Sequence, residues 1–168
     1  MIDDAALATT ELALSCRIAP LKNVVGDIGG IISAYSSELV SAFYPPIVSR
    51  KVEVALSELT ENVLKNFIDG DSGITIDMHI VDQNLTIRVS SVANLDQFLT
   101  VKAIVEKLKE TPSPRELLKT TIRKRRKEQQ KGGVGLLRLV AENRFDLDVK
   151  FEESVLAVES HIALGGLL

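Results

Sequence analysis

The sequence predicts a two-layer α/β sandwich, in which helices cover one face of a mostly antiparallel mixed sheet. The first observation is a β-hairpin signal, because apolar and polar residues alternate over 74–81 and 85–89 on either side of a polar turn. The second is a pair of alternating runs, at 145–151 and 155–162, that supply two closing strands. The third is an apolar stripe at helical spacing over 46–68, which can bury the apolar face of such a sheet.

The N-terminal part of the chain adds a strand and a further helix. Partial alternation predicts a strand over residues 10–19, which Pro20 ends. Apolar residues then recur at helical spacing over 21–43, and three glycines inside this range permit close packing. Pro45 and Pro46 break the chain before the next helix. We therefore expect two consecutive helices between the first strand and the hairpin.

A helical stretch separates the hairpin from the closing strands. Asn94 and Gln97 form a capping-box signal that opens one helix. Ser113 followed by Pro114 signals the start of a second helix, which runs into the basic segment 123–127.

The composition is that of an ordinary globular protein, and we expect residues 1–168 to form a single domain. Apolar residues make up 45% and charged residues 26%, and the net charge of -3 does not favour nucleic acid as a partner. Aromatic residues, at 4%, are too few for a stacking platform. A single cysteine, an acidic start and the lack of an apolar run of about 18 residues predict a cytoplasmic protein without a membrane span.

The predicted helix over 46–68 carries the first candidate site. Glu58, Asn62 and Asn66 follow one another at i, i+4 spacing, so they share one face beside the apolar stripe. Asparagine is a poor helix former, and carboxylate and amide oxygens suit Mg²⁺ that is otherwise held by phosphates. A glutamate beside such an ion can orient or deprotonate a nucleophile. The alternative is a solvated helix face.

The second candidate site is the glycine turn 132–135, which precedes a short apolar helix. Glycine lets backbone N–H groups approach an anion, and the preceding Lys131 and the basic segment 123–127 would favour a triphosphate. The alternative is a turn that ends one helix and starts another. No Gly-Lys-Ser/Thr follows, so the turn is not a P-loop.

Together, and in this order along the chain, the two candidate sites resemble the motifs of a known protein family. Glu58-x-x-x-Asn62 is similar to the N box of GHKL ATPases, and Gly133-x-Gly135-Leu136 to their second glycine box. The likeness is to small bacterial anti-sigma-factor serine kinases and SiaB-like regulators. It implies a Bergerat-type ATP-binding domain with an N-box helix at about 46–68, a lid at about 95–131 and a glycine box at 132–136.

The resemblance also implies roles for individual residues. Asn62 would coordinate the Mg²⁺ that bridges the phosphates of ATP, and Asn66 would help to hold the metal or the phosphates. Glu58 would be the catalytic base or orient the attacking group. Backbone amides of Gly133 and Gly135 would bind phosphate.

The sequence departs from the family after the hairpin. The family has Asp-x-Gly-x-Gly there, and its aspartate accepts a hydrogen bond from the adenine amino group. This chain has Ser90 to Asp96 in that place, without the Asp-x-Gly pattern. Asn94 has two interpretations, because its amide oxygen can accept from adenine or cap the following helix.

Three functions follow as alternatives. The leading one is an ATP-dependent serine/threonine kinase that acts on a small regulatory protein, such as a STAS-like anti-sigma antagonist. The second is a degenerate GHKL scaffold that binds a protein partner without phosphoryl transfer. The third is nucleic-acid binding through segment 123–127, for which a solvated lid face is the alternative. The apolar segment 21–43 has two interpretations, because it can be a helix of the core or the contact face of a homodimer. His79 and His161 are expected to be structural.

Overall fold

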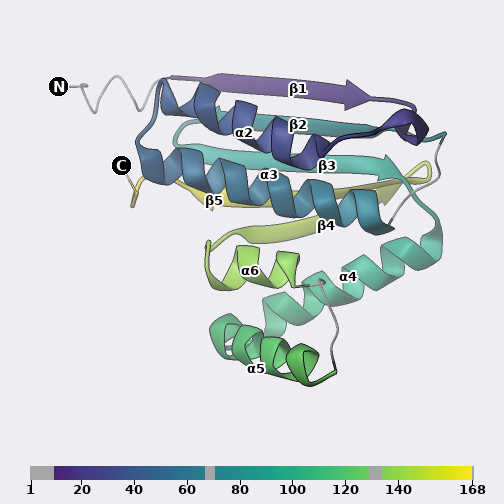
Figure 1. Ribbon diagram of the computed structural model, residues 1–168. Coiled ribbons are helices and arrows are strands. Elements are labelled where there is room, and N and C mark those ends of the chain that lie inside the picture. Colours follow the sequence, from purple (N-terminus) through teal and green to yellow (C-terminus); the bar gives the residue numbers. More distant parts are fainter. Residues whose placement is uncertain (1–9, 67–70, 129–133, 168) are drawn as a thin grey trace.

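The computed structural model describes residues 10–66, 71–128 and 134–167 (Figure 1). Five strands and five α-helices follow one another with a short 3-10 turn. In chain order these are β1 (Leu12–Ile18), the 3-10 turn η1 (Leu21–Asn23), α2 (Ile28–Ser41), α3 (Pro46–Asn66), β2 (Ile74–Val81), β3 (Asn84–Val92), α4 (Leu95–Glu110), α5 (Pro114–Lys127), α6 (Gly135–Ala141), β4 (Asp146–Glu152) and β5 (Val155–Ala163).

The strands form one sheet in the order β1-β2-β3-β5-β4, and all four pairings are antiparallel. The predicted α/β sandwich is confirmed, although no parallel pair is found among the described strands. Asp82 and Gln83 both have positive φ in the β2–β3 turn, as do Glu153 and Ser154 in the β4–β5 turn. Two successive residues with positive φ match the right-handed twist of the strands they join.

One face of the sheet is covered by α2, α3 and α6 (Figure 1). The central strands turn Ile76, Ile87 and Val158 towards these helices, and all three are almost fully buried. The apolar stripe predicted for helix α3 is buried, and Leu56 and Leu59 are among its members. Burying a leucine side chain contributes about 1.5–3 kcal/mol, so this interface holds the sandwich together.

The helix expected over 21–43 is shorter than predicted. Residues 21–23 form the turn η1, and α2 begins at Ile28 because the Asp27 side chain accepts a hydrogen bond from the Gly30 amide at 2.9 Å. Such a cap fixes the helix start more firmly than apolar spacing does.

Helices α4 and α5 form a hairpin that projects beyond β4 (Figure 1). The predicted capping box at Asn94 and Gln97 is present, whereas Ser113 occupies the cap position of α5 without a side-chain hydrogen bond. The ring of Phe98 stacks on Phe151 of β4, with 5.0 Å between the ring centroids. None of the helices in the described parts of the chain combines the length and apolar character needed to span a bilayer.

Candidate functional site

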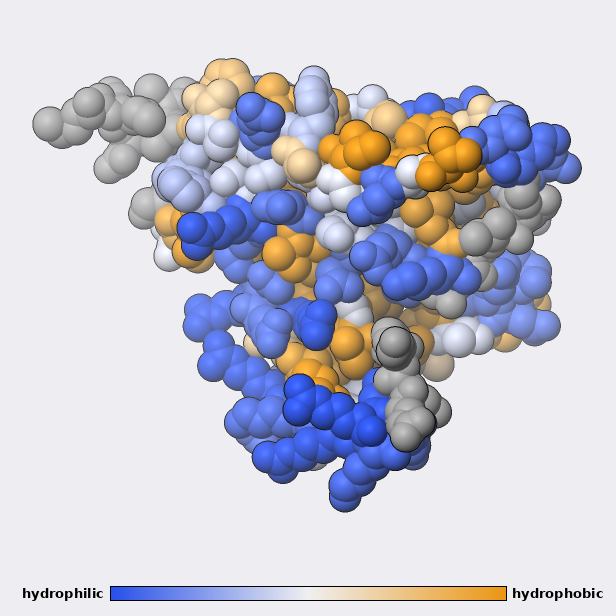
Figure 2. All heavy atoms as spheres, viewed as in Figure 1, coloured by the Kyte–Doolittle hydropathy of each residue, from blue (hydrophilic) through white to orange (hydrophobic). Residues whose placement is uncertain are grey.

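A cavity of about 580 Å³ lies between the α4–α5 hairpin, the C-terminal half of α3 and the start of α6. Its volume falls in the range of small-molecule sites, about 300–1,000 Å³. The residues that line it are Asn62 of α3; Asn94, Asp96, Gln97, Thr100, Val101, Ile104, Lys107 and Leu108 at the start and along α4; Leu117, Thr121 and Arg125 of α5; and Gly135, Leu136 and Leu137 of α6. Apolar side chains, orange in Figure 2, show at the surface between α6 and α5.

Three residues singled out in the sequence therefore share this cavity, namely Asn62, Asn94 and Gly135. They come from three separate parts of the chain, and the folding of the hairpin against α3 and α6 brings them to one place. The cavity combines an apolar wall with a few polar groups, which is the usual character of a small-molecule site.

Glu58 lies beside this cavity, one helical turn before Asn62. A Cβ atom at Gly135 would overlap the Glu58 carboxylate, so glycine leaves the space that this carboxylate occupies at the start of α6. The Arg138 guanidinium, one turn further along α6, lies 3.7 Å from a Glu58 carboxylate oxygen. The two candidate sites of the sequence thus meet at the contact between Glu58 and Gly135.

The surroundings of Glu58 change its acidity. Partial burial raises the pKa of the Glu58 carboxyl, and the nearby Arg138 charge opposes that rise. The net effect is an upward shift, which brings the group closer to the pKa that suits a general base near neutral pH. Perturbed carboxyls beside a cavity are frequent in functional sites.

Asn94 acts as a helix cap. Its side-chain oxygen accepts a hydrogen bond from the Gln97 amide at 2.9 Å, and the Gln97 side chain accepts one from the Asn94 amide at 2.9 Å. The capping interpretation of the sequence is therefore confirmed. Since an amide oxygen has two lone pairs, a second hydrogen bond from adenine remains a prediction.

The other sequence-predicted site residues are placed less fully. Asn66 ends α3, and its side chain lies outside the described part of the structure. Lys131 and Gly133 fall outside the described residues.

The donor set on the cavity wall is compatible with Mg²⁺. Among the residues that the structure describes, His, Cys, Asp and Glu form no group of three or more that could hold a metal. Mg²⁺ keeps several waters and takes few protein ligands beside phosphates, so the amide oxygen of Asn62 is a sufficient kind of ligand. It would bind here together with a nucleotide rather than alone.

Sequence reasoning missed several polar residues of the cavity, chiefly Asp96, Thr100 and Lys107 on α4 and Thr121 on α5, whereas Arg125 belongs to the basic segment predicted to favour a triphosphate. The i, i+4 spacing within each helix is a signal for a shared face, but it does not say what that face meets. The five cations of the basic segment 123–127 do not share one environment. Its Arg125 lines the cavity, while the other four cations of the segment are exposed.

Comparison of the chain with models of protein families and with curated proteins gives no match. The GHKL resemblance therefore rests on the sequence motifs of this chain alone.

Proposed function

We propose that the chain is an ATP-binding regulatory kinase of GHKL type, which acts in the cytoplasm on a serine or threonine of a small partner protein. The observation that carries the proposal is the meeting of Asn62, Asn94 and Gly135 at one cavity, with Glu58 packed against Gly135. A STAS-like domain is the kind of partner that the resemblance suggests.

The cavity offers different surroundings to the two ends of a nucleotide. Val101, Ile104 and Leu117 give an apolar wall suited to a base. Arg125 and the amide of Asn62 suit phosphates, because guanidinium groups form paired, charge-assisted hydrogen bonds with phosphate oxygens. Bound Mg²⁺ would neutralise phosphate charge that develops during transfer.

Glu58 provides the proton chemistry in this proposal. The acceptor hydroxyl oxygen forms a bond to the γ-phosphorus, the bond from that phosphorus to the ADP oxygen breaks, and the hydroxyl proton passes to the Glu58 carboxylate. ADP and the phosphorylated partner are the products. Catalysis of this kind depends mainly on positioning and charge stabilisation.

The first experiment titrates ATP with Mg²⁺ into the protein by calorimetry, with Asn62→Ala and the control Asn23→Ala, an exposed asparagine in η1. We expect binding to the parent and to Asn23→Ala, and at least tenfold weaker binding to Asn62→Ala. The absence of heat up to millimolar ATP, at any Mg²⁺ level, would contradict the proposal.

A second experiment separates binding from catalysis. Glu58→Gln should keep ATP affinity and lose about 10²–10⁴-fold in transfer of labelled γ-phosphate to a partner protein, which is the usual contribution of a general base. Retained transfer would remove Glu58 from the catalytic role.

A non-catalytic scaffold is the second candidate, and the capping role of Asn94 favours it. The residue proposed to replace the adenine-binding aspartate is already engaged with Gln97. A scaffold should bind its protein partner equally well after Glu58→Ala and should show no dependence on ATP.

A further inference from the structure

The two edges of the sheet are covered differently. At one edge α4 packs beside β4, where Phe98 stacks on Phe151 and Lys109 pairs with Asp148. At the other edge β1 pairs only with β2 among the described strands (Figure 1). The backbone N–H and C=O groups of β1 that point away from β2 therefore have no strand partner among the residues that the structure describes.

Strand β1 carries none of the usual features that keep an edge strand from pairing. Such strands are commonly very short, interrupted by a bulge, or supplied with proline or lysine. Strand β1 spans 7 residues, pairs with β2 in an uninterrupted register, and contains neither proline nor lysine. An edge of this kind is a ready template for a strand of another chain.

The apolar side of β1 is incompletely buried. Its residues on the helix side are half-buried, whereas the β2 residues paired with them are 0% exposed. The half-buried residues are Leu12, Leu14, Cys16 and Ile18, and their fully buried partners are Ile80, Met78, Ile76 and Ile74. The apolar layer of the sandwich is thus complete at β2 and open at β1.

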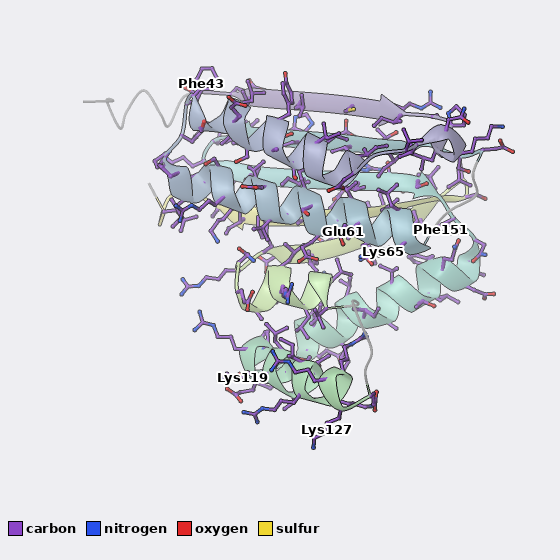
Figure 3. The ribbon with its side chains drawn as sticks, in the orientation of Figure 1. Phe43, Glu61, Lys65, Lys119, Lys127 and Phe151 are labelled. Carbon is purple, nitrogen blue, oxygen red and sulfur yellow. The ribbon has the colours of Figure 1, made fainter. Side chains whose placement is uncertain are left out.

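Helix α2 extends this apolar edge into the helix layer. It packs on α3, and α3 packs on α6, so α2 is the last of the three helices on the β1 side (Figure 1). Gly29 and Ser33 are buried towards α3, and Ile31 and Tyr35, on the opposite side of the helix, are 66% and 60% exposed. Phe43 is exposed near the start of β1 (Figure 3), and Figure 2 shows apolar side chains gathered over η1 and the start of α2.

Strand β1 is complementary to a second copy of itself. Two antiparallel copies keep their apolar sides on one face of the sheet only when a residue lies on the two-fold axis, because side chains alternate between the faces. With Leu14 on the axis, Glu11 of each copy lies opposite Arg17 of the other. Both side chains are exposed, and neither forms an ion pair with the residues that the structure describes. With Ser15 on the axis, Arg17 would lie opposite Ala13, so the charges select Leu14.

We infer that β1 pairs with β1 of a second copy of this chain, antiparallel and with Leu14 on the two-fold axis, so that one sheet runs through both copies. Helices pack at about 8–10 Å between axes, which is about two strand spacings, so the α2 helices of the two copies meet above the joined strands. Ile31 and Tyr35 are then buried in the dimer. None of the residues that line the cavity lies in β1 or α2, so both cavities stay open, and the inference does not depend on the proposed function.

The first test measures dimerisation of the full chain by light scattering from micromolar to submillimolar concentration. We expect the parent to dimerise, and Glu11→Arg and Arg17→Glu each to raise the dimer dissociation constant about tenfold, because like charges then lie opposite each other twice. The double variant exchanges the two charges and should restore the dissociation constant of the parent. Glu142→Arg, a charge reversal at an exposed position at the end of α6, is the control and should leave it unchanged.

The second test fixes the register by disulfide formation in a Cys16→Ser background, which removes the single cysteine. Residues directly opposite each other have Cβ atoms about 4.5–5.5 Å apart, so a disulfide forms after a small adjustment. We expect Leu14→Cys to give a covalent dimer under mild oxidation. Ser15→Cys, one position along the strand, should do so much more slowly.

Three results would overturn the inference. A parent that stays monomeric throughout the concentration range removes the second copy and leaves this edge to a protein of another sequence. A dimer that neither the charge reversals nor Leu14→Cys affects uses a different surface. A dimer in which Ser15→Cys forms the disulfide faster than Leu14→Cys does not have the register with Leu14 on the axis.

Discussion

The sheet with α2 and α3 differs from the α4–α5 hairpin in what holds it together. In the first region, α3 lays an apolar stripe across the fully buried side chains of the central strands. In the second, the two helices bury few residues, such as Val105 and Leu118, and α5 presents Lys119 and Lys127 away from the rest of the molecule (Figure 3). The first region therefore supplies stability, and it fixes Glu58 and Asn62 rigidly.

The hairpin supplies most of the remaining cavity wall and is joined to the sheet by a few specific contacts. Phe98 stacks on Phe151, Lys109 pairs with Asp148 at 2.5 Å, and the Arg115 side chain donates to the Ala141 carbonyl at 3.2 Å. Regions with few buried apolar contacts open at lower free energy than a core does. The cavity therefore joins a rigid half, which holds the proposed catalytic groups, to a half that can open for a ligand.

The largest expected effect comes from breaking the rigid region. Leu59→Ala removes a side chain that is 1% exposed and should destabilise the whole protein by about 2–5 kcal/mol. Leu118→Ala in α5 should cost about 2 kcal/mol and act chiefly on residues of the hairpin. Denaturant unfolding with native-state hydrogen exchange measures both changes. Equal loss of protection throughout the chain in both variants would contradict the distinction between the regions.

The next largest effect is expected on nucleotide affinity, where an arginine of α5 that lines the cavity is compared with an exposed one. Arg125→Ala should weaken MgATP binding about tenfold or more, because a hydrogen bond to a charged group contributes about 1.5–3 kcal/mol. Arg126→Ala, the exposed neighbour, is the matched control and should change the affinity less than twofold. Calorimetry at fixed salt gives both values. If the two variants lose affinity equally, Arg125 acts through general charge and does not contact the nucleotide.

A smaller effect is expected on the pH dependence of phosphoryl transfer, through the contact between Glu58 of α3 and Arg138 of α6. Arg138 lowers the pKa of the Glu58 carboxyl, so Arg138→Ala should raise that pKa further. Since Glu58 must be deprotonated to accept a proton, the acid limb of kcat/KM against pH should move to higher pH. Transfer should then fall at acidic pH and recover as pH rises. Arg138→Lys keeps the charge and should leave the limb near its original place, which a structural role alone would not predict.

The smallest effect is expected on the outer face of α2. Tyr35 is 60% exposed and lies outside the core, so Tyr35→Glu should change the free energy of unfolding by no more than about 0.5 kcal/mol. The same variant tests the homodimer that the apolar segment 21–43 suggests. Light scattering at several concentrations should show a dimer for the parent and a monomer for the variant if this face is the contact. A monomeric parent would remove the homodimer.

Local signals in the sequence predicted most of the fold. The alternation in β2 and β3 and the apolar stripe of α3 depend on neighbours along the chain, as does the capping box at Asn94. The start of α2 was wrong because apolar spacing continues through residues that Asp27 excludes from the helix.

Part of the cavity lining could be predicted from the sequence, for the same reason. Asn62, Gly135 and the basic segment of Arg125 carry local patterns, whereas Asp96 and Thr121 line the cavity only because the hairpin folds across α3 and α6. No spacing within α4 or α5 contains that information.

The pairing of β3 with β5 has a consequence for how the protein assembles. Val92 lies opposite Val155, so α4, α5, α6 and β4 all belong to the loop that this pairing closes. Contacts between residues so distant in the chain form slowly, because the entropy of a long loop is lost before they stabilise it. Most of the cavity wall lies inside that loop. A nucleotide can therefore stabilise the finished fold but cannot guide the early steps of folding, and it should slow unfolding more than it accelerates refolding.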